Sequence, residues 1–196
     1  MKRSLVLIAA LLAAMSAQAT ETQDLRGAEA KTALAQYETA LKAKADDAAA
    51  LKSAGIILHQ LSRVKPDKTQ VETAERYLKE AQKLQPQDPE ITAWLGSVIT
   101  MKALFETDPG KQTFFVKSGT RLLDKAIQQA PDNTVVRLTR AYNSLELPAF
   151  LMRTKFAVED FKYYLQLCAS KPCPADYVAD AKAKLAVAEK TVADNK

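Results

Sequence analysis

One short pattern of residue sizes recurs along the chain and restricts it to a fold of closely packed helices. In each copy a small residue is followed by a large apolar residue four positions later, by alanine seven later and by a helix-ending residue twelve later. The copies are Ala33, Tyr37, Ala40 and Ala45; Ala74, Leu78, Ala81 and Pro86; Gly119, Leu123, Ala126 and Pro131; and, more loosely, Ala157, Phe161, Tyr164 and Ala169. Spacings of three and four place each set on one face of a helix. Small residues on that face allow a neighbouring helix to approach closely.

The composition agrees with an all-α domain. Hydrophobic residues make up 47% of the 196 residues and charged residues 26%, which is typical of a folded globular chain. No alternating run of β-branched residues stands out, which rules out most β-sandwich and barrel folds. Apolar spacing and chain breaks predict about eight helices, at about residues 25–45, 47–62, 69–85, 89–105, 112–130, 134–146, 152–168 and 174–193.

Two helix starts carry recognisable capping signals. Asp88 precedes Pro89, which suits an N-cap followed by proline at the first helical position. Thr69 and Glu72 have the spacing of a capping box, which predicts a helix start at Thr69. Prolines such as Pro131 end the preceding helices, because proline cannot continue the hydrogen-bond ladder.

The helices between the four copies also carry small residues at mid-helix. The positions are Ala54 with Gly55, Leu95 with Gly96, and Arg140 with Ala141. Over residues 26–169 the alternation resembles the tetratricopeptide repeat, a helix-turn-helix unit of about 34 residues. The resemblance implies an α-solenoid with a right-handed superhelix. Its helical pairs would span about residues 47–86, 88–131 and 133–169, and residues 174–193 would form a terminal capping helix.

The spacing between helices departs from that repeat. From each mid-helix small residue to the small residue of the next helix the repeat expects 12 positions, whereas here the steps from Gly55, Gly96 and Ala141 are 19, 23 and 16. Each pair is therefore lengthened between its two helices. A plain α-helical bundle is the alternative fold.

The first residues have the pattern of an export signal. Lys2 and Arg3 precede an apolar run over residues 5–14, and Ala17 and Ala19 occupy the positions that a signal peptidase reads. The pattern predicts a signal peptide over residues 1–19 and a single mature domain over residues 20–196, located in the periplasm or secreted. A membrane anchor is the alternative, but ten residues extend only about 15 Å as a helix. We therefore expect no stable membrane insertion after cleavage.

Charge and residue types disfavour nucleic-acid binding and catalysis. The net charge of +5 falls to +3 without Lys2 and Arg3, and acidic and basic residues are interspersed. His59 is the only histidine, and the five glycines are isolated, so neither a histidine-rich metal centre nor a phosphate-binding loop is expected. Neighbouring carboxylates fall at helix starts or on solvated faces rather than opposed across a cleft. The sequence thus predicts no enzyme, no cofactor and no metal.

Cys168 and Cys173 enclose four residues between a helix end and Pro174. In an oxidising compartment two cysteines this close usually pair. The sequence favours a structural disulfide that fixes the angle of the last helix. Free thiols and a redox role are the alternatives.

The repeat resemblance places one face of each first helix on a concave groove. The groove-facing positions would be Lys52, Ile56 and His59; Ala93, Ser97 and Thr100; and Leu138, Tyr142 and Leu145. Lys52, His59, Thr100 and Tyr142 are the candidate partner-binding residues among them. Tyr142 is the preferred anchor, since aromatic residues with a polar tip dominate interface energetics. For His59 the alternative is a half-exposed helix residue without a binding role.

Two further features suggest recognition. Arg137 and Arg140 lie three positions apart on one helix, where guanidinium groups suit a carboxylate or a peptide terminus. The alternative is an ordinary solvated face. Residues 147–152 form an apolar run at a helix break, which favours burial against the core over a docking patch.

The expected function is a non-catalytic periplasmic scaffold or adaptor that binds a protein or peptide in its groove. The alternative is an envelope accessory protein that binds a small molecule or glycan there. An open groove would favour the first, and a closed pocket of a few hundred cubic ångströms the second.

Overall fold

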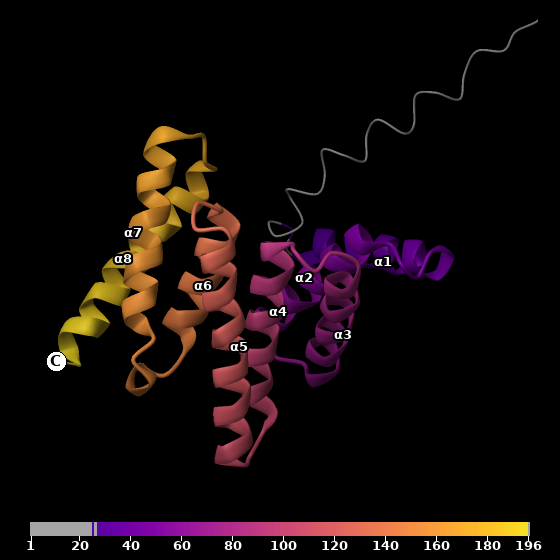
Figure 1. The fold of residues 1–196 in the computed structure, drawn as a ribbon, viewed down its shortest axis with the longest axis horizontal. Helices are drawn as coiled ribbons and strands as arrows, with labels where there is room; N and C mark the ends of the chain where they lie inside the picture. Colours follow the sequence, from indigo (N-terminus) through magenta and orange to yellow (C-terminus); the bar gives the residue numbers. More distant parts are fainter. Residues whose placement is uncertain (1–24, 26, 196) are drawn as a thin grey trace, which may run out of the picture.

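The computed structural model describes residue 25 and residues 27–195, and every regular element in this part of the chain is helical (Figure 1). The α-helices are α1 (Gly27–Ala43), α2 (Ala48–Val64), α3 (Lys68–Leu84), α4 (Pro89–Met101), α5 (Pro109–Gln129), α6 (Thr134–Glu146), α7 (Thr154–Ser170) and α8 (Ala175–Asp194). Two short 3-10 helices, η2 (Lys102–Phe105) and η3 (Ala149–Leu151), follow α4 and α6. The prediction of an all-α fold is confirmed. The predicted signal peptide, residues 1–19, lies outside the described residues.

Aspartate or asparagine side chains begin five of the helices. Each accepts a hydrogen bond from a backbone N–H of the first turn and so satisfies a donor that the helix leaves unpaired. The caps are Asp47, Asp67, Asp88, Asp108 and Asn133. The prediction for Asp88 and Pro89 is confirmed. The predicted start at Thr69 is wrong, because Asp67 accepts from the Gln70 N–H and α3 begins one residue earlier, at Lys68.

Neighbouring helices pack as hairpins. The most extensive helix contacts are α2 with α3, α4 with α5, and α6 with α7, and α8 returns against α7. Helix α4 also contacts α6, which brings the first helices of two successive hairpins together. In Figure 1 the α4, η2 and α5 hairpin extends beyond the hairpins on either side.

Glycine allows two helix backbones to meet within the α4 and α5 hairpin. A Cβ atom on Gly96 would lie 2.7 Å from the Gly119 carbonyl oxygen, and one on Gly119 would overlap the Gly96 carbonyl. In the preceding hairpin a Cβ on Gly55 would lie 2.7 Å from the Leu78 Cγ. At Gly55, Gly96 and Gly119 the neighbouring helix therefore leaves no room for a side chain.

The apolar core is divided along the array. One cluster joins α2, α3 and α4 and includes Ile56, Leu78 and Trp94. A second joins α6, α7 and α8 and includes Leu138 and Phe161. A smaller cluster, which includes Ala93 and Ala126, lies between them, across α4, α5 and α6. Each of these clusters thus joins the two helices of a hairpin to the helix that follows them.

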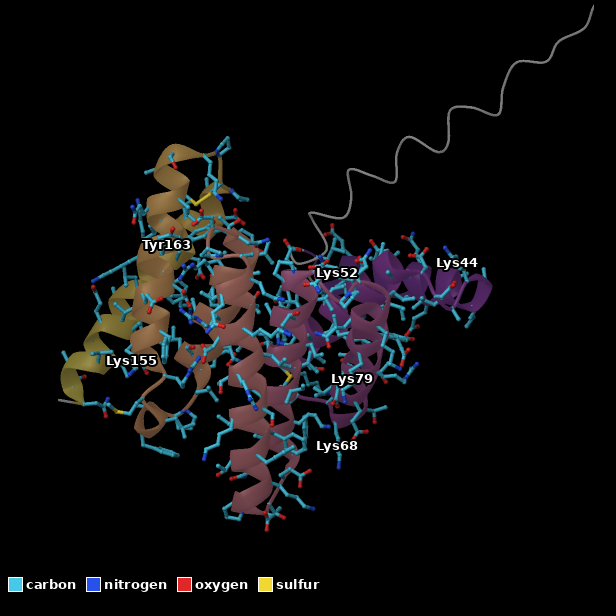
Figure 2. The ribbon with its side chains drawn as sticks, in the orientation of Figure 1. Lys44, Lys52, Lys68, Lys79, Lys155 and Tyr163 are labelled. Atoms are coloured by element: carbon cyan, nitrogen blue, oxygen red, sulfur yellow. A yellow bond between two sulfur atoms is a disulfide. The ribbon has the colours of Figure 1, made fainter. Side chains whose placement is uncertain are left out.

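A disulfide joins Cys168 at the end of α7 to Cys173 before α8. Their Cα atoms are 5.5 Å apart, and the bond is the yellow link near the top of α7 in Figure 2. The turn between the two helices is therefore covalently closed. No helix in the described part of the chain is long and apolar enough to cross a bilayer.

Candidate functional site

A cavity of about 500 Å³ lies where α2, α4, α6 and α8 face one another. These four helices come from distant parts of the sequence, so the cavity exists only once the hairpins have stacked and α8 has folded back. Its walls combine apolar, aromatic, polar and charged side chains: His59, Gln60, Arg63, Trp94, Ser97, Val135, Leu138, Thr139, Tyr142, Asn143, Glu146, Asp176, Tyr177, Asp180 and Lys184.

Four of the positions expected on the groove meet at this cavity. They are His59 from α2, Ser97 from α4, and Leu138 and Tyr142 from α6. Helical spacing places them on the inner face of each first helix, while the adjacent small residues turn toward the second helix.

His59 lies in the inner wall, where it is buried. Its Nε2 is 2.9 Å from the Ser97 Oγ, and its ring meets the Trp94 ring edge-on with centroids 5.2 Å apart. Burial, with a smaller effect from the positive charge of Arg63, lowers the pKa of His59 to about 3. The imidazole is therefore neutral at pH 7.

Three residues of the same wall carry buried polar atoms that have no hydrogen-bond partner within the described chain: His59 Nδ1, Trp94 Nε1 and Asn143 Oδ1. A buried polar atom without a hydrogen bond lowers the stability of the fold by about 1–3 kcal/mol. Three such atoms at one cavity therefore suggest that these side chains serve a purpose other than stability. The Asn143 amide nitrogen is better satisfied, since it donates to Thr100 and, at 3.3 Å, to the Ser97 hydroxyl.

The rim is held together by contacts between three helices. The Tyr142 hydroxyl donates to the Asp180 carboxylate on α8 at 2.5 Å. Arg63 of α2 pairs with Glu146 of α6 and places its guanidinium 5.5 Å from the centre of the Tyr142 ring. Burial and the hydrogen bond to Asp180 raise the pKa of Tyr142, so the phenol stays protonated. Tyr142 therefore links the α2 and α8 sides of the cavity.

Two predicted groove residues lie elsewhere, because their polar groups are engaged within the fold. Lys52 bridges Asp88 and Glu90 at 2.9 and 2.8 Å, at the start of α4. Burial lowers the pKa of Lys52, but these two acidic partners outweigh it and leave the pKa raised. Thr100 is buried and donates to the Ser97 carbonyl at 2.7 Å. Ile56, Ala93 and Leu145 do not line the cavity either.

Arg137 and Arg140 do face a carboxylate, but it belongs to the same chain. Both donate to Asp160 of α7, with Arg137 Nη1 at 2.7 Å and Arg140 Nε at 2.6 Å. Arg140 also reaches Asp124 at 3.2 Å and Glu159 at 3.0 Å. Because both guanidinium groups are buried, the alternative of a solvated face is wrong.

The expectation that residues 147–152 are buried is wrong at two positions. Phe150 is 80% exposed and Met152 is 65% exposed. The 3-10 helix η3 turns the chain sharply and directs these two side chains outward, and Met152 has a left-handed φ of 58°.

The sequence interpretation missed one wall of the cavity. Asp176, Tyr177, Asp180 and Lys184 belong to α8, which was expected only to cap the array. Trp94 was also missed as a site residue. No local signal in the sequence shows which helices α8 packs against. Helical spacing predicts which face of α8 is buried, but it does not predict which helix covers that face.

In the described part of the chain, no cluster of three or more His, Cys, Asp or Glu side chains is arranged to hold a metal ion. Comparison of the sequence with models of protein families, with curated proteins and with solved structures gave no match.

Proposed function

We propose that this chain is a non-catalytic adaptor of the tetratricopeptide type, which binds a short segment of a protein or peptide partner in the cavity between α2, α4, α6 and α8. The observation that carries the proposal is the composition of the cavity wall, where apolar side chains such as Leu138 lie beside aromatic and charged ones. Such a mixture suits an amphipathic peptide, whose apolar side chains need burial while its backbone needs hydrogen bonds.

The unpartnered atoms of the wall support a peptide ligand. Trp94 Nε1 is a donor and Asn143 Oδ1 is an acceptor, and a peptide group offers one carbonyl and one N–H to match them. Both atoms are shielded from solvent, so a bound segment reaches them only after cavity-lining side chains shift. Changes of interface rotamer on binding are common.

The environment of His59 supports a binding role over a catalytic one. A general base works best with a pKa near the operating pH, and His59, at about 3, is far below it. Its contact with Ser97 therefore serves to position two neutral polar groups in the wall.

The phased small residues and the hairpin contacts support the tetratricopeptide assignment, and the resemblance implies a right-handed superhelix. The pattern of residues 1–19, together with the disulfide, supports export to an oxidising compartment, the periplasm or the exterior.

A second candidate function is binding of a small molecule or glycan. The cavity volume of about 500 Å³ favours it, because pockets for such ligands span roughly 300–1,000 Å³.

The test is affinity capture from a periplasmic extract, followed by calorimetry with synthetic peptides covering the captured protein. Tyr142→Ala should weaken peptide binding by about 5- to 30-fold, or about 1–2 kcal/mol, without loss of helical content. Tyr163→Ala is the matched control, since Tyr163 also donates to an aspartate, Asp132, but does not line the cavity.

Asp180→Asn provides a second variant, because Asp180 is exposed and its change leaves the Tyr142 ring in place. Peptide affinity that is unchanged in both cavity variants contradicts the proposal. Retention of a sugar or small metabolite in place of a protein supports the second candidate.

A further inference from the structure

Exposed apolar side chains are concentrated at one edge of the molecule. Seven large hydrophobic side chains are exposed among the described residues, and five of them lie near the connection between the two helices of a hairpin. These five are Val64, Leu104, Phe114, Phe150 and Met152, with 63% to 83% of each side chain exposed. We call the segments 63–68, 102–114 and 146–155 the tip edge.

The topology places these three segments together. The helices alternate in direction, so the connections from α2 to α3, α4 to α5 and α6 to α7 all lie at the lower end of Figure 1. Figure 2 shows Lys68 toward this end and Lys52 at the opposite one. The opposite edge, formed by segments 42–47, 83–90, 129–134 and 170–176, has only Leu84 as an exposed large hydrophobic residue.

The two edges also differ in charge. The tip edge contains seven Lys or Arg and four Asp or Glu, whereas the opposite edge contains four Lys or Arg and six Asp or Glu. Three of the four tip-edge acids are engaged within the chain: Asp67 and Asp108 cap helices, and Glu146 pairs with Arg63. Within the described chain, no ion pair involves the four exposed lysines Lys65, Lys68, Lys111 and Lys155.

The connection between α6 and α7 is held in a shape that directs its apolar side chains outward. Arg153 donates two hydrogen bonds to Asp124, at 2.9 and 2.7 Å, and stacks on Phe156. The preceding Met152 adopts a left-handed backbone conformation that non-glycine residues seldom use. The connection is thus anchored in a shape that exposes Phe150 and Met152, although both could bury apolar area by folding back.

We propose that the tip edge adsorbs to the surface of a bilayer that contains anionic lipids. Apolar side chains at separate hairpin ends can each enter a fluid interface, while the neighbouring lysines meet lipid phosphates. A rigid protein partner instead requires one continuous complementary patch, and these side chains stand on three separate connections.

The α4, η2 and α5 hairpin makes the first contact, because it extends beyond its neighbours in Figure 1. It carries Leu104 and Phe114 near its end, and Lys111 and Lys117 are exposed beside them. Its helices meet the membrane end-on, so penetration stops at the depth of the headgroups. This adsorption differs from a transmembrane span and does not depend on the proposed cavity function.

The test is sedimentation of the purified exported protein with vesicles of phosphatidylcholine containing about one third phosphatidylglycerol. We expect the protein to bind these vesicles at low salt and to bind them less as the salt concentration is raised. Binding to vesicles of phosphatidylcholine alone should be weaker by about fivefold or more. Leu104→Ser combined with Phe114→Ser should reduce binding to the anionic vesicles by about fivefold or more. Leu84→Ser combined with Val187→Ser is the matched control, because it removes two exposed apolar residues outside the tip edge.

Charge is tested separately with Lys111→Glu against Lys44→Glu on the opposite edge. Only the Lys111 variant should weaken binding to anionic vesicles. All variants are compared in the same processed form and checked for unchanged helical content. The proposal is overturned if the protein does not sediment with anionic vesicles at low salt, which would leave the tip edge to a protein partner, or if tip-edge and control variants bind equally.

Discussion

Arg140 on α6 holds Asp160 on α7 through two hydrogen bonds, from Nε to Oδ2 at 2.6 Å and from Nη2 to Oδ1 at 2.9 Å. Arg137 adds a third, at 2.7 Å, and all three residues are buried. Removing one member of such a group leaves buried charges uncompensated, and this costs more than the intact group contributes.

Asp160→Asn should therefore lower the free energy of unfolding by about 3–5 kcal/mol, measured by urea denaturation. Glu159→Gln is the control at the neighbouring position. Its side chain is 56% exposed, and the change should cost about 1 kcal/mol or less. If both variants lose the same free energy of unfolding, the burial of Asp160 does not add to the cost of removing its charge.

Replacing Gly96 with alanine should destabilise the protein by about 1–3 kcal/mol. The added Cβ would meet the backbone carbonyl of Gly119, which cannot rotate away as a side chain could. Ser118→Ala, beside Gly119 on α5, should change stability by about 0.5 kcal/mol at most. Thermal unfolding of both variants measures the difference, and a neutral Gly96→Ala would mean that α4 and α5 separate easily.

His59 should make the stability fall in mild acid. Its pKa is about 3 in the folded protein and near 6.5 when unfolded, so below pH 6.5 the unfolded state binds the proton more tightly. The stability that this group contributes is fully present above pH 6.5 and declines by at most about 1.4 kcal/mol per pH unit as the pH falls toward 3. Denaturation at several pH values should show a shallower decline in His59→Gln, and parallel curves for the two proteins would contradict the shift.

Reduction of the disulfide between Cys168 and Cys173 should lower stability by only about 2 kcal/mol, because the loop that it closes is short. The double variant with both cysteines replaced by serine should match the reduced protein. Intact mass with and without reduction establishes the bond in exported material. Thiols that react without reductant in freshly exported protein would refute it.

N-terminal sequencing of the exported protein should begin at Thr20, as expected from the alanines at positions 17 and 19. Exported protein that still carries residues 5–14 would refute cleavage after Ala19.

Local chemistry predicted the helices well but not their partners. Prolines and apolar spacing placed all eight, and the glycines of α4 and α5 meet as small residues on facing helices should. His59 and Tyr142 line the cavity because helical periodicity defines an inner face. The ion pair between Asp160 and Arg140, in contrast, could not be predicted from the sequence, because it depends on how α6 and α7 stack. The α8 wall and the exposure of Phe150 likewise depend on tertiary packing.

The division of the apolar core has a mechanical consequence for the cavity. His59 and Trp94 belong to the half built on α2, α3 and α4, whereas Tyr142 and Leu138 belong to the half built on α6, α7 and α8. Helix α6 contacts both α4 and α5, and both sets of contacts are less extensive than those inside the hairpins. A small rotation between the halves would change the width of the cavity and leave these two apolar clusters intact, but it would disturb the smaller cluster across α4, α5 and α6. The width of the cavity therefore depends on the angle between these two parts, and a ligand touching both walls would fix that angle.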